Sequence, residues 1–117
     1  ANSLSFLTGL LFGHDVEQGL EAARVLIHYD DGTKGEFSLL AKVDVFDYWV
    51  NNSSQLEAIQ NLDDEKIGWI GTCAKGNDRA LTKFTWQNPQ PNKSISHIDL
   101  VGGLSDCAPF IVGITIE

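Results

Sequence analysis

The chain has 117 residues, and its 43% hydrophobic content suits a single core but not two. Its 8 basic and 16 acidic side chains give a formal net charge of -8, which repels phosphate backbones and anionic membrane surfaces. We therefore expect one domain over residues 1–117, with neither nucleic acid nor a membrane as a partner.

The first predicted elements are a strand and a hairpin. The stretch "ANSLSFLTGLLFG" (1–13) is an apolar run interrupted by polar residues, and we interpret it as the first strand. In "RVLIHY" (24–29) the odd positions are apolar, the period of a strand with one buried face, and the alternation resumes at 36–39. The Asp-Gly pair between these runs predicts a tight turn. Asp30 and Asp31 are interpreted as turn residues whose carboxylates accept hydrogen bonds from nearby backbone amides.

Only one stretch favours a helix. In "SSQLEAIQNLDDE" (53–65), Leu56, Ile59 and Leu62 would share one face, and Ser53 or Ser54 would cap the first turn. We expect at most one short helix, near 53–62.

The second half of the chain predicts further strands. They are "EKIGWIGTC" (65–73), "LTKFTWQN" (81–88) after a turn at 76–78, "ISHIDLVG" (95–102) after a segment with two prolines, and "PFIVGITIE" (109–117). Trp69 and Trp86 stand in mid-strand and are expected in the core. In the last run Phe110, Val112, Ile114 and Ile116 would share a face, and Gly113 would mark a bulge or a close contact. The pattern predicts an all-β protein, an antiparallel, jelly-roll-like β-sandwich.

Reactive side chains give few functional signals. Cys73 and Cys107 either form one disulfide, worth ~3 kcal/mol by loop closure, or remain two buried thiols, and both alternatives stay open. His14, His28 and His97 are too scattered along the sequence to predict a metal cluster. No pair of carboxylates is singled out for glycoside hydrolysis, so we expect a protein that is not an enzyme.

Several segments together resemble a known family. They are "HYDDGTKGEFSL", "VDVFDYWV", "IGWIGT", "FTWQNPQPNKSISHIDL" and "APFIVGITIE", in this order. The pattern is similar to that of the galactose-binding-like β-sandwich modules, akin to carbohydrate-binding modules, that are appended to secreted bacterial polysaccharide-degrading enzymes. This chain has Asp47-Tyr48-Trp49 where that pattern has an aspartate and two tryptophans. The resemblance implies an extracellular, non-catalytic module attached to a catalytic domain.

A module of this kind binds sugars by stacking them on aromatic rings and bonding their hydroxyls with planar polar groups. The candidate ligand-binding residues are Tyr48, Trp49, Asn51, Asn52, Gln87 and Asn88. The acidic charge favours neutral polysaccharides or oligosaccharides, with dissociation constants of about 10 µM to 1 mM. No cofactor is predicted with certainty, although loop aspartates make a structural calcium ion a hypothesis.

The alternative is a structural accessory or protein-interaction β-sandwich domain with no glycan ligand. An exposed aromatic ring beside polar groups in a shallow groove would favour the first function. An exposed apolar patch would favour the alternative.

Overall fold

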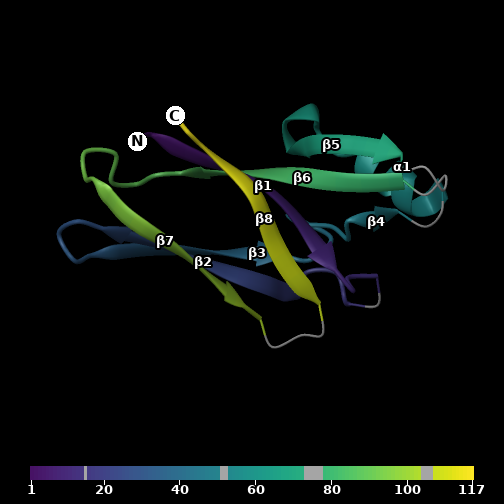
Figure 1. Ribbon diagram of the computed structural model, residues 1–117, viewed down its shortest axis with the longest axis horizontal. Coiled ribbons are helices and arrows are strands. Elements are labelled where there is room, and N and C mark those ends of the chain that lie inside the picture. Colours follow the sequence, from purple (N-terminus) through teal and green to yellow (C-terminus); the bar gives the residue numbers. More distant parts are fainter. Residues whose placement is uncertain (15, 51–52, 73–77, 104–106) are drawn as a thin grey trace.

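The computed structural model describes residues 1–14, 16–50, 53–72, 78–103 and 107–117, which form two sheets packed against each other (Figure 1). The five-stranded sheet has the order β4-β6-β1-β8, and β5 also pairs with β6. Its strands are β1 (Ser3–Leu11), β4 (Trp49–Val50), β5 (Ile67–Thr72), β6 (Asp78–Gln87) and β8 (Ala108–Ile116).

The three-stranded sheet has the order β3-β2-β7, with β2 (Glu21–Tyr29), β3 (Lys34–Leu40) and β7 (Ile95–Gly102). Every pairing between named strands is antiparallel, which confirms the predicted all-β sandwich. One short helix, α1 (Ser53–Gln60), and a 3₁₀ turn, η1 (Asp64–Lys66), follow β4. Among the described residues no helix is long and apolar enough to cross a membrane.

The core lies between β1 and β2. Leu4, Phe6 and Leu10 point inward from β1, Val25 and Ile27 point inward from β2, and all five are fully buried. Their spacing of two confirms the predicted alternation, and burial of each such side chain contributes roughly 1.5–3 kcal/mol. Partly buried aromatic rings extend this core between the sheets and stack or meet edge to face: Phe37, Phe84 and Trp86.

The predicted hairpin is the β2–β3 pair, and its turn has the expected chemistry. Gly32 has a φ of +86°, a conformation that costs glycine little. Asp31 accepts a hydrogen bond from the backbone N–H of Thr33 at 3.0 Å, and it also pairs with Lys93 Nζ at 2.9 Å. The hydroxyl of Thr33 and then Lys93 hold the pKa of Asp31 well below its ordinary value. The acid therefore ties the turn to the loop before β7, a contact that the sequence did not predict.

The predicted helix face is confirmed. Ile59 is buried, and it packs with Val50 and Ala80 in a small second cluster that Leu56 and Leu62 also join. This cluster seats α1 on β4 and β6, next to the end of the sandwich. Asn52, which precedes the helix, lies outside the described residues.

The predicted single face of the last strand is wrong, because β8 contains a register shift. Leu7 pairs with Gly113 while Thr8 pairs with Ile111, so the extra residue is Val112, beside the glycine that the sequence singled out. The shift turns Ile111 toward the core and leaves Phe110 on the opposite face, next to Gly9.

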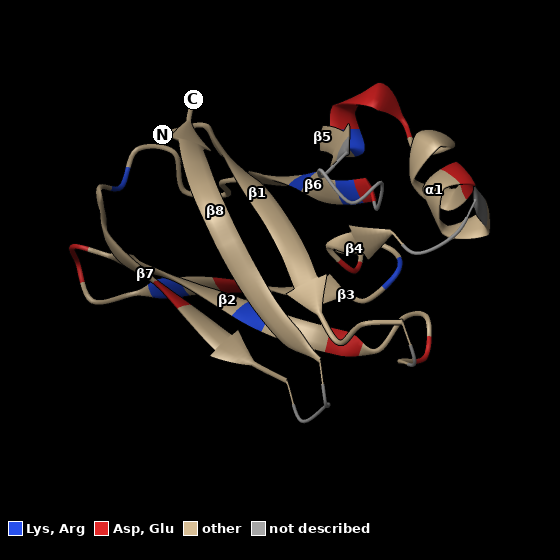
Figure 2. Cartoon of the chain, turned by 45° about the vertical axis from the view of Figure 1, so that its right-hand side comes forward, with Lys and Arg blue, Asp and Glu red and all other residues tan. Residues whose placement is uncertain are grey.

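One side of the sandwich is open where β7, an edge strand of the smaller sheet, and β8, an edge strand of the larger one, stand apart (Figure 1). Ile114 and Ile116 pair with the fully buried Phe6 and Leu4 and so occupy core-facing positions, yet they are 41% and 72% exposed. We call this opening the β7–β8 slot. It has a volume of about 500 Å³, and its lining includes the apolar residues Ala1, Leu4, Ile95, Ile98 and Ile116. Figure 2 shows that β8 carries no charged residue.

The two tryptophans that were expected in the core, Trp69 and Trp86, differ in burial. Trp86 is partly buried and packs against the core, in line with the prediction. For Trp69 the prediction is wrong, since this side chain is 46% exposed. Its neighbour Ile70 packs inward, so Trp69 projects from the outer face of β5, where its ring lies against the backbone of Gly71.

Candidate functional site

A pocket of about 250 Å³ opens at the end of the sandwich beside α1. Its walls come from the loop after β1, the segment that leads into β4, β4 itself and α1. One side of the lining is apolar and consists of Phe46, Val50, Ala58 and Ile59. The other side carries polar groups from His14, Gln18, Lys42, Asp47 and Gln55. Trp49 also lines this opening, which we call the Trp49 pocket.

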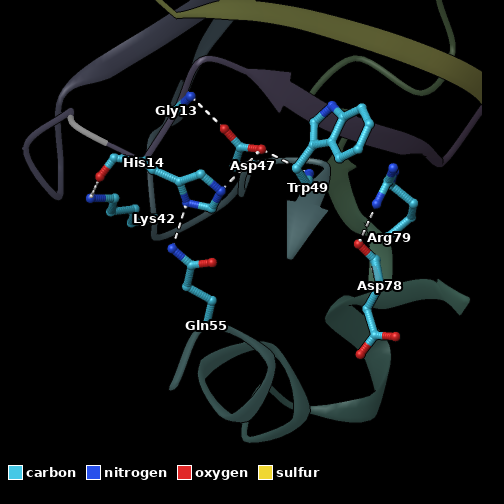
Figure 3. A network of polar contacts seen from close by, with 8 residues as sticks. All are labelled: Gly13, His14, Lys42, Asp47, Trp49, Gln55, Asp78 and Arg79. Carbon is cyan, nitrogen blue, oxygen red and sulfur yellow. Dashed lines mark hydrogen bonds and ion pairs between the residues drawn. The ribbon is translucent and has the colours of Figure 1, made fainter. Parts of the chain in front are cut away.

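Asp47 holds the pocket together (Figure 3). Its buried carboxylate accepts hydrogen bonds from the backbone N–H of Gly13 at 2.5 Å and from that of Trp49 at 2.8 Å. A side chain on Gly13 would crowd Leu10 and this carboxylate, so glycine permits the close approach. Asp47 therefore joins the loop after β1 to β4 and fixes the backbone from which Trp49 projects.

His14 presents the least satisfied polar atom of the pocket. Its Nδ1 lies 2.9 Å from the side-chain nitrogen of Gln55, and its backbone oxygen accepts a hydrogen bond from Lys42 Nζ at 2.8 Å. Its Nε2 is buried without a hydrogen-bond partner, although Asp47 Oδ1 lies 3.5 Å away. A buried polar atom of this kind costs free energy until it meets a partner, and a ligand hydroxyl would be one.

Trp49 is 42% exposed, and a cation holds its ring in place. The guanidinium carbon of Arg79 lies 3.2 Å from the ring centroid, and Arg79 Nη1 donates to the backbone oxygen of Asp78 at 3.0 Å. Such a contact is favourable, because the ring face is electron-rich. Arg79 therefore covers one face of the indole.

The backbone is strained at the rim of the pocket. Among the described residues other than glycine, positive φ angles occur at Phe12, with 59°, and at Lys42, with 60°. Each conformation costs roughly 1–2 kcal/mol in a residue with a Cβ atom. Both residues lie on segments that build the pocket, and strain of this kind gathers at binding and catalytic sites.

The structure separates the candidate residues predicted from sequence. Trp49 lines the pocket, whereas Tyr48 is half-buried and packs edge to face on Phe110 at 5.8 Å. Asn51 and Asn52 lie outside the described residues, so their predicted roles stay predictions.

Gln87 and Asn88 lie far from the Trp49 pocket. Trp49 pairs with Arg79 on β6, and Gln87 follows eight residues later, about 26 Å away at roughly 3.3 Å per residue. Asn88 is buried, accepts a hydrogen bond from the hydroxyl of Tyr29 at 2.6 Å and donates one to the backbone oxygen of Ala1 at 2.8 Å. The side-chain amide of Asn88 therefore stabilises the fold.

The polar groups of the pocket that sequence reasoning missed are His14, Gln18, Lys42 and Gln55. They come from three segments, and no spacing in the sequence connects them. The only local signal was Trp49 after an aspartate, and the structure explains it through the bond from the backbone N–H of Trp49 to Asp47.

The remaining predictions concern cysteines and metals. Cys107 is buried and Cys73 lies outside the described residues, so the disulfide and the two-thiol alternatives both stay predictions. The calcium hypothesis also stays a prediction. The description of the histidines as scattered is wrong for two of them, because His28 and His97 stack on adjacent strands with ring centroids 4.1 Å apart.

Comparisons with known proteins identified no relative of this chain. No protein-family model matches the chain, and no curated protein or solved structure matches it. Inference about function therefore depends on the geometry of the site and on the resemblance described above.

Proposed function

We propose that this domain is a non-catalytic carbohydrate-binding module whose ligand site is the Trp49 pocket. The observation that carries the proposal is a half-exposed indole that shares one concave site with hydrogen-bonding side chains on its other walls. A sugar ring has the matching surfaces, since its C–H face packs on an aromatic ring while its hydroxyls need polar partners.

The polar groups of the pocket suit hydroxyls. The side-chain amide of Gln55 contacts Nδ1 of His14 at 2.9 Å, and Nε2 of the same ring, which has no hydrogen-bond partner, offers a site for a hydroxyl. Asp47 already accepts hydrogen bonds from two backbone N–H groups. Its carboxylate is therefore less available to pair with a cationic ligand. These features favour a neutral sugar, as the acidic composition also does.

The size of the pocket favours a small part of a glycan. Its volume of about 250 Å³ is below the roughly 300–1,000 Å³ of most ligand sites. We therefore propose that it takes one ring at the end of a chain or a side branch. A long polysaccharide segment would need a groove along the sheet.

The single carboxylate among the described residues of the pocket supports a non-catalytic function. Glycoside hydrolysis needs two carboxyl groups, roughly 5–9.5 Å apart, on either side of the scissile bond. Asp47 is the one carboxylate among the described residues that line the Trp49 pocket, and its oxygens hold the backbone. The module would keep an attached catalytic domain near its extracellular polysaccharide.

The test is affinity gel electrophoresis across neutral and acidic polysaccharides, with the wild type, Trp49→Ala and Trp69→Ala. We expect a neutral polysaccharide to retard the wild type and Trp69→Ala. Trp49→Ala should bind about tenfold more weakly or worse, because truncating an aromatic anchor costs on the order of 2 kcal/mol and about 1.4 kcal/mol is tenfold.

Trp69→Ala is a matched control, because it removes an equally exposed indole from a strand that does not line the pocket. Circular dichroism and thermal melts would verify that both variants fold. Retardation of folded Trp49→Ala equal to that of the wild type would overturn the assigned site. Absence of retardation by every polysaccharide would overturn glycan binding itself.

A second candidate function is a structural accessory domain that packs against a neighbouring domain of the same protein. The β7–β8 slot favours it, because core-facing isoleucines are exposed there on an uncharged strand. Apolar exposure of this kind commonly marks a protein contact. The two functions use different parts of the surface, so one module can serve both.

A further inference from the structure

We propose that His28, His97 and Asp99 form a binding site for a divalent transition-metal ion on the outer face of the three-stranded sheet. The site is separate from the Trp49 pocket and does not depend on the proposed glycan binding. Its three side chains come from the neighbouring strands β2 and β7.

The strand register brings these residues together. His28 lies directly opposite His97, and Leu26 lies opposite Asp99. Side chains two positions apart project from the same face of a strand, and directly opposed residues share a face. Because Ile27 is fully buried and Ile98 packs against the core, the alternate positions of both strands face outward.

The ligand atoms are already close to a coordinating arrangement. His28 Nε2 lies 2.9 Å from Asp99 Oδ2, and one ligand atom from each of the three residues lies within 4.8 Å of the others. Ligands on a tetrahedral zinc ion, with bonds of about 2.0–2.2 Å, stand about 3.4 Å apart. A metal ion would take the place of the hydrogen between His28 Nε2 and Asp99, and a neutral His28 ring would then carry its proton on Nδ1.

The His97 ring needs the largest adjustment. It stacks on His28 at an interplanar angle of 10°, so the two rings now run nearly parallel, and a chelate requires their lone pairs to converge. His97 is exposed, so its ring can turn toward the metal without displacing a buried side chain.

A neighbouring serine contacts one of the two ring nitrogens of His97. Ser96 Oγ lies 2.7 Å from His97 Nδ1. When this Nδ1–H donates to the serine, the lone pair of the ring stands on Nε2, and outer partners of this kind orient most metal-bound histidines. The register shift between His28 and Tyr29 skips Ser96, and such bulges re-aim side chains.

The surroundings neither block nor strongly attract a cation. On β3, Lys34 lies opposite His28 and Glu36 lies opposite Leu26, so their charges offset each other. Arg24, from the same face of β2, is held by Glu21 at 3.2 Å. Asp99 supplies the negative charge nearest to the imidazoles.

The donor set defines the class of metal. Two imidazoles and one carboxylate suit zinc, nickel and copper, whereas calcium and magnesium prefer sites made of oxygen alone. Three protein ligands would leave a zinc ion one position open to water.

The experiment is isothermal titration calorimetry of the chelator-treated chain with zinc chloride, repeated with nickel and calcium chlorides. We expect one zinc or nickel ion per chain and no competition from calcium in tenfold excess. His97→Ala and Asp99→Asn should each weaken zinc binding at least about tenfold, since loss of even an outer partner of a metal site costs about 10- to 100-fold.

Asp64→Asn is the matched control for Asp99→Asn, because it removes the same charge from an exposed residue in η1, remote from the histidines. It should leave zinc affinity unchanged. In the wild type, nitrogen NMR shifts of the imidazole rings should move at His28 and His97 and stay fixed at His14. Zinc binding that survives both ligand substitutions, ring shifts at His14 alone, or no binding at millimolar zinc would each overturn the proposal.

Discussion

The Trp49 pocket and the β7–β8 slot are both openings at the margin of one sandwich, and they differ in chemistry. In the pocket, polar side chains face an indole, and a buried aspartate holds two loops in place. In the slot, isoleucines that point toward the core stay exposed between the edge strands β7 and β8. A site with fixed polar groups can select a small ligand, whereas bare aliphatic surface distinguishes partners mainly by shape.

The two openings also arise in different ways. The pocket is built by loops whose backbone is held in strained conformations at Phe12 and Lys42. The slot lies between two edge strands, β7 of the three-stranded sheet and β8 of the five-stranded sheet. Substitutions should therefore act on binding at the pocket, while at the slot they should change neither binding nor the stability of the isolated domain.

The largest expected effect compares the slot with the core. Ile27→Ala should lower the free energy of unfolding by about 2–5 kcal/mol, because it leaves a cavity between the sheets. Ile116→Ala should lower it by less than about 0.5 kcal/mol, because that side chain is already exposed. Urea titrations measure both values. A loss of more than about 2 kcal/mol in Ile116→Ala would mean that the slot is closed.

The next effect concerns the acid that supports the pocket. Asp47→Ala should destabilise the fold by about 2–3 kcal/mol, because two backbone N–H groups lose a charged acceptor. The same variant should lose glycan retardation, since Trp49 would no longer be held by this bond. Asp64→Ala removes an exposed acid outside the pocket and should change neither property. Unaltered stability in Asp47→Ala would show that the carboxylate does not join the loops.

The smallest expected effect is electrostatic. It concerns the turn between β2 and β3, which lines neither opening. The pKa of Asp31 is lowered in the folded state by the Thr33 hydroxyl and Lys93, so its carboxylate stabilises the fold above its unfolded pKa of about 3.9. This contribution is lost as the pH falls through the lower, folded pKa. Asp31→Asn should therefore melt slightly below the wild type at pH 7, and the gap should narrow below a pH of about 4.

Asp30→Asn is the control for this pH dependence, because no ion pair of Asp30 is found within the described part of the chain. Its melting temperature should follow that of the wild type at every pH. A gap between Asp31→Asn and the wild type that persists unchanged at pH 2 would contradict the electrostatic explanation.

Local patterns predicted the strands well. The alternation in 24–29, the Asp-Gly turn and the apolar face of 53–60 depend on neighbours in sequence, and all three are confirmed. The predictions were wrong where contacts with residues far away in the sequence determine which way a side chain points. Trp69 is exposed because it projects from the outer face of β5 while Ile70 packs inward, and Phe110 changes face because β8 shifts its register against β1.

The candidate site could be predicted only in part from the sequence, for the same reason. Trp49 could be nominated from a short aromatic stretch, but His14, Lys42 and Gln55 meet it only through the packing of loops and α1. The contact between His28 and His97 depends on the pairing of β2 with β7, which lie far apart along the chain. Spacing in the sequence cannot reveal either arrangement.

The central claim is that the Trp49 pocket, and not the β7–β8 slot, binds a neutral sugar. The most direct test is a titration of the ¹⁵N-labelled domain with an oligosaccharide from a polysaccharide that retards it. We predict that amide shifts gather at Gly13, His14, Trp49 and the first turns of α1, with the Trp49 indole N–H among the largest. Shifts confined to β7 and β8, with those pocket resonances unmoved, would contradict the account.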